Sequence, residues 1–477
     1  MAISILKTKL YAPPIRADLV SRPRLIERLN ARPERKLTLI SAPAGFGKTT
    51  LATEWLRSAG RPLSWISLDE GDNDPARFLG YLAAALQSIS SEIGGSVHQQ
   101  LEGPQPPPIE TLLTDLVNDI DAHSPPFIIV LDDYHVISSQ QVHEIIRFLV
   151  AQEPPQMHLV ILSRQDPPLP LPLLRGRGQL LEIRQADLCF TPDEATTYLN
   201  QAMRLGLDTA NIAALKAHTE GWIAGLQLAA LAIRAQSAGG GPDSVSQFID
   251  GFSGRHHFIL DYLADEVLRH QPEPIYTFLL RTSILEQMCG SLCDAIVDLP
   301  KETIPTSGQQ ILEQLHRANL FVVPLDDERH WYRYHRLFGD LLAARLRESA
   351  PAEVPALHRR AAVWFEENDL PVEAIRHALA IPDYDLAGDM IEHAISQAAG
   401  WSSINAAILH EWLGVLPEDV VSARPRLRLF SSRILYLTGR RETAARILDD
   451  LADSLRDDPA HPDAHELLGL VVADRAS

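Results

Sequence analysis

The sequence has few cysteines. Cys189, Cys289 and Cys293 are an odd and sparse set that provides no disulfide framework. Disulfides accumulate in oxidising compartments, so this set indicates a protein of the reducing cytoplasm. Cys289 and Cys293 are four residues apart, but no neighbouring Cys or His pair completes a zinc set, and we expect both in the core.

Long apolar runs are also lacking. The most apolar stretch, Trp222 to Ile233, is too short to span a bilayer and contains Gln227, so it predicts a buried helix. The N-terminal stretch carries Lys7 and Lys9 but no apolar centre, which argues against a signal peptide. We therefore expect no contact with a membrane.

Basic residues are outnumbered by acidic ones. Lys and Arg together number 43 and Asp and Glu number 62, which gives a net charge of −19 at pH 7. Because phosphate backbones are bound by basic surfaces, this balance argues against a protein whose main surface grips nucleic acid. The hydrophobic content of 45% is that of a globular protein, and 477 residues exceed one compact core, so several domains are expected.

The chain is organised around the stretch A-P-A-G-F-G-K-T, from Ala42 to Thr49. It follows an apolar run, Leu37–Ser41, and opens a helical stretch, Thr49–Ala59, which is the strand, loop and helix arrangement of a phosphate-binding loop. The usual first Gly is replaced by Ala42, a small residue. The alternative is a Gly-rich turn that happens to precede Lys-Thr, and the flanking strand and helix argue against it.

Each residue type in this loop has a role in binding phosphate. Gly45 and Gly47 let the backbone curl so that its N–H groups point at phosphate oxygens, and the helix N-terminus adds its positive dipole end. Lys48 would neutralise the β- and γ-phosphates, and the Thr49 hydroxyl would bind Mg²⁺. The predicted nucleotide-binding residues of the loop are Ala44, Gly45, Phe46, Gly47, Lys48, Thr49 and Thr50.

Two carboxylates and an arginine follow later predicted strands. An apolar run ends in Asp132 and Asp133, which places Asp132 to hold Mg²⁺ through water and Asp133 to orient an attacking water. Another run ends at Arg164, which we predict to sense the γ-phosphate, with a plain surface arginine as the alternative. The predicted catalytic residues are Lys48, Asp133 and Arg164, and the predicted metal ligands are Thr49 and Asp132.

Apolar runs alternate with helical stretches up to Phe190, which predicts a parallel sheet covered on both faces, the small P-loop NTPase core. The strand pattern then stops, and Thr191 with Glu194 predicts a capped helix start. Two strand-like pieces among helices, Leu320–Pro324 and Trp331–Tyr334, predict a winged-helix unit. The five predicted strands of the sheet are Leu37–Ser41, Leu63–Leu68, Phe127–Leu131, His158–Ser163 and Gln179–Ile183.

From Val354 the pattern is helical only. Helix–turn–helix pairs and the 37-residue spacing of Pro425 and Pro462 approach the period of tetratricopeptide-like repeats. Because this pattern has no capping repeat, we expect the chain to be part of a longer protein. The predicted parts are a P-loop NTPase domain at 1–190, a helical domain at 191–281, a winged-helix domain at 282–348, a helical arm at 349–423 and the start of tetratricopeptide-like repeats at 424–477.

These motifs together resemble a known family, the MalT group of STAND-class signal-transduction ATPases, which are ATP-dependent LuxR-type transcription regulators. The phosphate loop alone is unspecific, but the ordered set of motifs is specific and covers nearly the whole chain. Besides S-A-P-A-G-F-G-K-T-T, the set contains S-L-D-E-G-D-N at Ser67–Asn73, V-L-D-D-Y-H at Val130–His135, L-S-R at Leu162–Arg164, Q-L-L-E-I at Gln179–Ile183, G-W-I-A-G-L-Q-L at Gly221–Leu228, D-Y-L-A-D-E-V-L at Asp261–Leu268 and Y-H-R-L-F-G-D-L-L at Tyr334–Leu342.

The resemblance implies further site residues. The backbone around Leu19 and Val20 would cradle adenine, and Arg22 would lie near the nucleotide, ATP or ADP. His335 matches a winged-helix His that touches the β-phosphate of ADP in related NB-ARC ATPases; a buried core His is the alternative. Asp69–Asn73 has no role that the sequence reveals beyond a turn and helix cap.

The chain also departs from its relatives in two ways. NB-ARC relatives carry a Pro in a G-x-P motif, whereas Gly221-Trp222-Ile223 has none, as in the MalT group, which leaves the adenine-side contact open. MalT-type activators end in a DNA-binding helix-turn-helix, which is absent from this sequence. We therefore expect DNA as a partner only through such a C-terminal domain.

The resemblance implies a slow ATPase that acts as a switch. ADP would hold the sheet, helical and winged-helix domains together, and an unidentified small-molecule or protein inducer bound by the C-terminal helices would favour exchange to ATP and self-association. The alternative is an interaction scaffold with a structural nucleotide and no significant turnover. A metabolic P-loop kinase is disfavoured, because no acceptor-substrate domain is visible.

Overall fold

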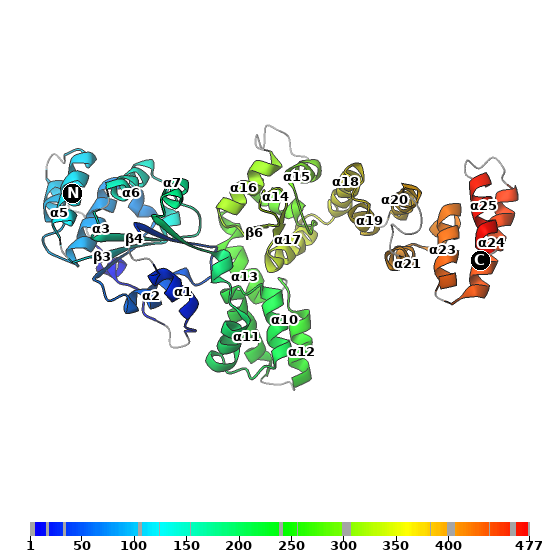
Figure 1. Cartoon of the computed structure of the whole chain (residues 1–477), viewed down its shortest axis with the longest axis horizontal. Helices are drawn as coiled ribbons and strands as arrows, with labels where there is room; N and C mark the ends of the chain where they lie inside the picture. Colours follow the sequence, from blue (N-terminus) through cyan, green and yellow to red (C-terminus); the bar gives the residue numbers. More distant parts are fainter. Residues whose placement is uncertain are drawn as a thin grey trace. The chain divides into compact units, whose positions relative to one another are not determined.

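The chain folds into two compact units, which Figure 1 colours along the sequence. Unit 1 comprises Met1–Glu273 and Ile311–Leu342, and unit 2 comprises Pro274–Gln310 and Ala343–Ser477. The five domain boundaries drawn from the sequence are finer than this division and stay predictions. The computed structural model describes residues 5–15, 19–31, 35–103, 107–123, 125–152, 154–237, 242–254, 256–297, 307–381, 383–397, 406–437, 439–457 and 464–475.

Unit 1 is built on a five-stranded parallel sheet, as the sequence predicted, and its strand order is β2-β3-β4-β1-β5. The predicted strands are confirmed, and their ends differ by at most one residue. Because β1, β3 and β4 are buried along their whole length, they are continuous apolar runs rather than alternating ones. The strands are β1 (Leu37–Ser41), β2 (Leu63–Ser67), β3 (Phe127–Asp132), β4 (Met157–Ser163) and β5 (Leu180–Arg184).

Helices cover both faces of this sheet (Figure 1). On one face lie α1 (Pro23–Asn30) and α2 (Lys48–Ser58). On the other lie α3 (Pro75–Gln87), α5 (Ile109–Ala122) and α6 (Gln140–Gln152), with α4 (Gly95–Glu102) against α3 and α7 (Leu171–Gly176) beside β5. Leu39, Ile129 and Ile161 join the core on this second face. This packing fixes the strands, and their carboxyl ends carry the loops of the predicted site.

A helical region continues unit 1 after β5. The predicted cap is confirmed, because the Thr191 hydroxyl accepts the Glu194 N–H at 3.2 Å and the Glu194 carboxylate accepts the Thr191 N–H at 2.9 Å. The helices are α8 (Gln185–Leu188), α9 (Pro192–Thr196), α10 (Thr209–Thr219), α11 (Ile223–Ser237), α12 (Pro242–Gly251) and α13 (His257–Glu266), with a π-helical turn at Thr197–Ala202 and 3₁₀ turns at Lys7–Leu10, Glu70–Asn73, Tyr134–Val136 and Leu268–His270.

A small antiparallel hairpin also belongs to unit 1. It pairs β6 (Val322–Pro324) with β7 (Tyr332–Tyr334), and helices α16 (Gly308–Arg317) and α17 (Arg336–Ser349) flank it. The predicted hairpin is confirmed, but its first strand is shorter than predicted. Asn319 and Phe321 have φ values of +49° and +56°, which a strand does not allow.

Unit 2 is helical, as predicted for the C-terminal part of the chain. Cys289 and Cys293 lie in its core, with exposed fractions of 1% and 0%. Gly439 has a φ of +84° and lies between α23 and α24, where the chain reverses direction. Pro462, which the predicted repeat spacing used, lies outside the described residues. The helices are α14 (Glu273–Thr282), α15 (Gly290–Val297), α18 (Val354–Glu367), α19 (Pro371–Leu379), α20 (Tyr384–Gln397), α21 (Ala406–Val415), α22 (Glu418–Ser422), α23 (Pro425–Leu437), α24 (Arg441–Asp457) and α25 (Ala464–Arg475).

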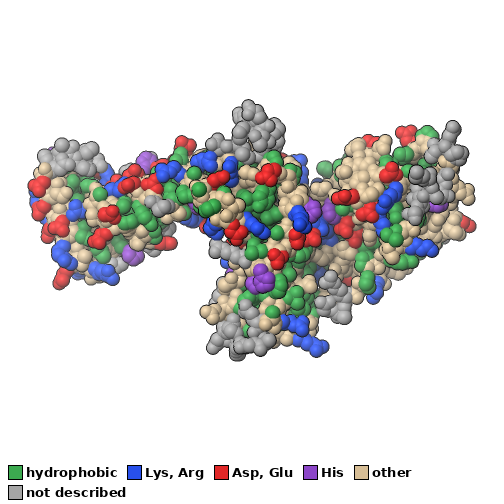
Figure 2. Space-filling model, turned by 180° about the vertical axis from the view of Figure 1, so that it is seen from behind, with side chains coloured by type: hydrophobic (Ala, Val, Ile, Leu, Met, Phe, Trp, Pro, Cys, Tyr) green, Lys and Arg blue, Asp and Glu red, His purple; other side chains and the backbone are tan. Residues whose placement is uncertain are grey.

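The surface has the mixed charge that the composition predicts. On the face shown in Figure 2, acidic and basic side chains of the described residues are interspersed. Among the described helices, none combines the length and the apolar character that crossing a bilayer requires.

Candidate nucleotide-binding site

The predicted phosphate loop connects β1 to α2. Gly45 and Gly47 both have a φ of +76°, the left-handed region that favours glycine. Lys48 is 8% exposed, and its ammonium group donates hydrogen bonds to the carbonyl oxygens of Ala42 at 2.9 Å and Pro43 at 3.0 Å. Burial, and then the charge of Arg164, lowers the pKa of Lys48 to about 8. A phosphate in this loop would supply the counter-charge that the buried ammonium needs.

The predicted metal ligands lie together at the end of β3. The Thr49 hydroxyl donates to both carboxylate oxygens of Asp132, each at 3.2 Å. Burial, and then the neighbouring Asp133, raises the pKa of Asp132 to about 7. A hydroxyl and a carboxylate beside a glycine-rich loop are the oxygen ligands that Mg²⁺ takes in such sites, so the residues present fit a magnesium nucleotide.

Asp133 and His135 stand on the turn that follows. Asp133 has a φ of +56°, and its side chain is 50% exposed, so it remains accessible to water. The Nδ1 atom of His135 lies 3.8 Å from the Asp133 carboxylate, and burial, then the charges of Arg164 and Lys48, lowers the pKa of His135 to about 3. His135 is therefore neutral at pH 7. His135 was not predicted as a site residue; its only signal in the sequence was its place at the end of the motif V-L-D-D-Y-H.

Arg164, the predicted γ-phosphate sensor, is bound to α13. Its guanidinium pairs with the Glu266 carboxylate at 2.9 Å and donates to the Glu266 carbonyl oxygen at 3.4 Å. Its charge still acts on Lys48, as the lowered pKa of Lys48 shows. Glu266 belongs to the D-Y-L-A-D-E-V-L motif, so that motif supplies a partner for the predicted sensor.

A pocket beside the phosphate loop contains the residues predicted to cradle adenine. Leu19 and Val20 line it together with Gly47 and Thr50 of the loop and helix α2. From the helical region Ile223 lines the same pocket, and a Cβ placed on Gly47 would lie 3.0 Å from its Cδ1 atom. Ile223 stands at the third position of Gly221-Trp222-Ile223, so an isoleucine supplies the wall where NB-ARC relatives have proline. The other residues that line the pocket are Arg22, Leu51, Glu54, Phe190, Tyr198 and Gln227.

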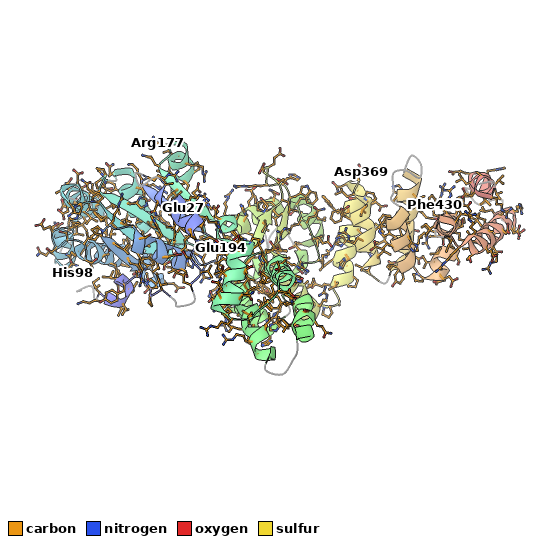
Figure 3. The ribbon with its side chains drawn as sticks, turned by 60° about the horizontal axis from the view of Figure 1, so that its bottom comes forward. Glu27, His98, Arg177, Glu194, Asp369 and Phe430 are labelled. Carbon is orange, nitrogen blue, oxygen red and sulfur yellow. The ribbon has the colours of Figure 1, made fainter. Side chains whose placement is uncertain are left out.

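Arg22 lines this pocket, but its guanidinium is committed elsewhere. It is 3% exposed, pairs with Glu194 at 3.4 Å and donates to the carbonyl oxygens of Leu188 at 2.8 Å and Cys189 at 3.2 Å. Arg24 pairs with the same carboxylate at 2.9 Å, and Glu194 is labelled in Figure 3. These contacts fasten the N-terminal segment to the start of the helical region. The Nη1 atom of Arg22 is buried and forms no hydrogen bond within the described residues.

The start of α11 closes over the phosphate loop. The indole N–H of Trp222 donates to the Ala44 carbonyl oxygen at 3.0 Å, and the Ala224 N–H donates to the Gly45 carbonyl oxygen at 3.0 Å. A Cβ placed on Gly45 would lie 2.5 Å from the Ala224 Cβ atom. The sequence analysis missed these contacts, although G-W-I-A-G-L-Q-L was among its motifs.

His335 lies in the core beside this junction. It is 1% exposed, and its Nε2 atom lies 3.1 Å from the Thr219 carbonyl oxygen. Its ring centroid is 6.0 Å from that of Trp222 and 5.6 Å from that of Phe321, whose ring lies 6.1 Å from that of Phe46 in the phosphate loop. Burial lowers the pKa of His335. His335 is therefore connected to the phosphate loop through the ring of Phe321, which contacts both His335 and Phe46.

Comparison with known proteins agrees with this architecture. A family model of the MalT winged helix domain matches residues 264–354. The HTH-type transcriptional regulator MalT of Serratia proteamaculans is 35% identical over 464 residues, which cover 95% of this chain and 49% of the regulator. The same regulator of Cronobacter sakazakii is 33% identical over 98% of this chain and 51% of its own.

Over nearly its whole length, this chain is similar to the MalT group of STAND-class P-loop ATPases. It spans about half the length of the MalT regulators that it matches. The serine/threonine-protein kinase PknK of Mycobacterium tuberculosis is also similar, 34% identical over 88% of this chain and 37% of the kinase. Among solved structures, the Walker-type ATPase PABY2304 of Pyrococcus abyssi matches 69% of this chain and 97% of its own length, at 15% identity and a TM-score of 0.44.

Proposed function

We propose that this stretch is the nucleotide-controlled switch of a MalT-like transcriptional regulator, closed with ADP and self-associating with ATP. One observation carries the proposal: three parts of unit 1 meet at the phosphate loop. The loop joins β1 of the sheet to α2. Trp222, just before α11, and Ala224 of α11 donate hydrogen bonds to the carbonyl oxygens of Ala44 and Gly45, and Phe321 contacts Phe46 from the segment before β6. A nucleotide whose phosphates bind in this loop therefore has different contacts when these parts are together and when they are apart.

The residues of the site have separate roles in this proposal. Lys48 neutralises phosphate charge, Thr49 and Asp132 hold Mg²⁺, and Asp133 orients the water that attacks ATP. Mg²⁺, when bound, supplies positive charge that stabilises the charge developing on the phosphates. The Asp133 side chain is 50% exposed, so its carboxylate oxygens can accept a hydrogen bond from water.

The relatives support a module that is shared by different proteins. The same stretch is similar both to proteins named as HTH-type transcriptional regulators and to one named as a serine/threonine-protein kinase. Since regulators and a kinase share this segment, we expect it to control the activity of another domain, such as a DNA-binding or a kinase domain, rather than to carry that activity itself. We propose that DNA is bound only through a helix-turn-helix domain outside these residues, that an inducer acts through the C-terminal helices, and that the protein works in the cytoplasm.

The contact that would hold the ADP state is a bond from His335 to the β-phosphate. Since the Nε2 atom of His335 faces the Thr219 carbonyl oxygen, Nε2 carries a proton, and the neutral ring presents Nδ1 as an acceptor. Nδ1 is buried and has no hydrogen-bond partner among the described residues. To bond a phosphate oxygen through Nδ1, His335 must take up a proton. ADP retention is therefore expected to strengthen as the pH falls.

The test compares His335→Ala with His158→Ala. His158 is a buried histidine of the sheet, bonded to Thr38 at 2.9 Å and to the Arg35 carbonyl oxygen at 2.6 Å, so it controls for the loss of a core histidine. A charge-assisted hydrogen bond contributes about 1.5–3 kcal/mol, and we expect His335→Ala to release ADP roughly ten- to a hundredfold faster. It should also self-associate with ATP in the absence of inducer.

The measurements are the ADP release rate between pH 6 and 8, the sedimentation of the ATP-loaded protein and the nucleotide that copurifies with it. The pH dependence should be weaker in His335→Ala than in the wild type. Unchanged ADP release, with a loss of stability equal to that of His158→Ala, would return His335 to the core. A fixed ADP without turnover or self-association would favour the alternative, an interaction scaffold.

A further inference from the structure

The stretch Asp69–Asn73, whose role the sequence did not reveal, lies directly beside the carboxylates of the site. It follows β2, which is the neighbour of β3 in the sheet, with Ser67 level with Asp132. The Leu68 N–H donates to the Asp132 carbonyl oxygen at 3.0 Å. The end of β2 and the start of the Asp132–His135 turn are therefore held together by backbone bonds, and side chains of 69–73 can act on that turn.

Asn73 makes the contacts that reach the far end of the turn. Its side-chain oxygen accepts the N–H groups of Ser138 at 2.6 Å and Ser139 at 2.8 Å. Its side-chain NH₂ donates to the carbonyl oxygens of Val136 and Glu70, both at 3.0 Å. The orientation of the amide is unambiguous, since the reversed amide would face two carbonyls with its oxygen and two N–H groups with its nitrogen.

The turn that Asn73 holds is a strained one. Asp133 has a φ of +56°, which costs a non-glycine residue free energy and persists only where the surroundings impose it. The Val136 N–H donates to the Asp133 carbonyl oxygen at 3.1 Å, which closes the turn from inside. Asn73 bonds the backbone that follows this turn, at the Val136 carbonyl oxygen and at the N–H groups of Ser138 and Ser139. It therefore closes the turn from outside.

Asn73 is itself held in place. Asp72 is 0% exposed, and its carboxylate accepts from the Arg77 guanidinium at 3.1 Å, from the Asp69 N–H at 2.9 Å and from the Lys9 ammonium. These charges fix the short helix Glu70–Asn73 between α3 and the N-terminal segment. Because this short helix is fixed, the Asn73 side chain can hold the backbone that it contacts; we call this the Asn73 clamp.

We propose that Asn73 is a positioning residue that holds Asp132, Asp133 and His135 in the geometry needed for the magnesium nucleotide. Its function in turnover rests on the proposed ATPase activity, whereas the clamp itself does not. Loss of Asn73 should free the turn and leave the phosphate loop and its Lys48 intact. Nucleotide affinity and turnover should therefore respond differently.

The test uses Asn73→Ala with Asn200→Ala as a matched control. Asn200 clamps another loop of unit 1 in the same manner, since its side chain donates to the Leu207 carbonyl oxygen and accepts the Leu207 N–H, both at 2.8 Å. It is not among the residues that line the pocket beside the phosphate loop. A general effect of losing a loop clamp should appear in both variants.

The first readout is amide hydrogen exchange of residues 134–139 in the nucleotide-free protein. We expect exchange at Ser138 and Ser139 to rise roughly tenfold in Asn73→Ala and to stay unchanged in Asn200→Ala. Asn73→Asp keeps the acceptor for both N–H groups and should restore their protection. Unchanged exchange at Ser138 and Ser139 in Asn73→Ala would refute the clamp, regardless of the results for nucleotide binding and turnover.

The second readout separates binding from chemistry. ADP affinity should change by less than about threefold in Asn73→Ala, while ATP turnover should fall roughly ten- to a hundredfold because the carboxylates are misplaced. An equal loss in both, or a fall in turnover matched by Asn200→Ala, would overturn the positioning role. If the wild type does not hydrolyse ATP, the proposed function fails. The role of Asn73 as a clamp is then tested by amide hydrogen exchange and by the Mg²⁺ dependence of ADP binding.

Discussion

Replacing Gly45 by alanine tests whether the phosphate loop and α11 form one packed junction. A Cβ atom at this position would lie 2.5 Å from the Ala224 Cβ atom, 2.9 Å from the Trp222 indole nitrogen and 3.0 Å from the Tyr262 hydroxyl. The backbone carbonyl of Gly45 also accepts the Ala224 N–H, so the loop cannot move away without losing that bond. The added methyl group therefore has to displace the start of α11.

The expected magnitude has two parts. Gly45 has a φ of +76°, and a side chain in the left-handed region costs about 1–2 kcal/mol. Overpacking of a closed site adds typically about 1–3 kcal/mol. Gly60 separates the two, because it has a φ of +62° but nothing within 4 Å of the position that a Cβ atom would take. Gly60→Ala should show the backbone part alone, and Gly45→Ala should cost about 1–3 kcal/mol more.

The assay is denaturant unfolding of the nucleotide-free protein, so that no lost phosphate contact enters the comparison. Ala224→Gly should recover part of the loss when combined with Gly45→Ala, since it removes the atom that the new methyl group meets at 2.5 Å. Equal destabilisation by Gly45→Ala and Gly60→Ala, with no recovery in the double variant, would refute the packed junction.

Four further predictions concern the charged groups of the site. Lys48→Ala should abolish ATP and ADP binding by calorimetry, because the phosphates lose their fixed counter-charge. Asp132→Asn should stabilise the protein, free of nucleotide and magnesium, by up to about 4 kcal/mol at pH 8 but not at pH 4. The reason is that the raised pKa of Asp132, about 7, makes the stability of the wild type fall as the pH rises from 4 to 7. Thermal unfolding of both proteins between pH 4 and 8 tests this prediction. Asp133→Ala should leave ATP bound but slow its hydrolysis. Arg164→Ala should weaken ATP more than ADP, whereas Glu266→Gln, which removes its carboxylate partner, should favour ATP in competition binding.

The sheet could be predicted because its signals are local. Each strand is an apolar run bounded by turn residues, and the loop after β1 carries its glycines and Lys48 in consecutive positions. The order of the strands, β2-β3-β4-β1-β5, was not predicted and comes from the structure alone. The hairpin was predicted for the same reason, and its first strand was overestimated because Asn319 and Phe321 have positive φ values. Asparagine often adopts such a conformation, whereas phenylalanine rarely does, so the sequence gives no signal of it at Phe321.

The contacts between distant segments could not be predicted from local patterns. The bond from Trp222 to Ala44 joins residues 178 positions apart, and the pairing of Arg22 with Glu194 joins residues 172 apart. A tryptophan in an apolar helix start and an arginine in an irregular segment have many possible partners. The clamp at Asn73 was hidden for the same reason, since its partners lie beyond β3.

The four residues Thr219 to Trp222 connect the nucleotide site to the hairpin. Glu220 and Gly221 have φ values of +51° and +77°, so the chain reverses between α10 and α11. On one side of this turn Trp222 bonds the phosphate loop. On the other side the Glu220 carboxylate accepts two hydrogen bonds from Arg333 of β7, at 2.7 and 2.8 Å.

This connection has a thermodynamic consequence. If a nucleotide changes the position of the phosphate loop, the same turn transmits the change to Arg333 and to His335, which bonds Thr219. Coupling of this kind is reciprocal: the free energy by which a bound nucleotide stabilises the ordered hairpin equals the free energy by which the ordered hairpin favours nucleotide binding. The Pro of the G-x-P motif is not required for it, because the left-handed backbone of Glu220 and Gly221 sets the turn and Ile223 supplies the wall of the pocket.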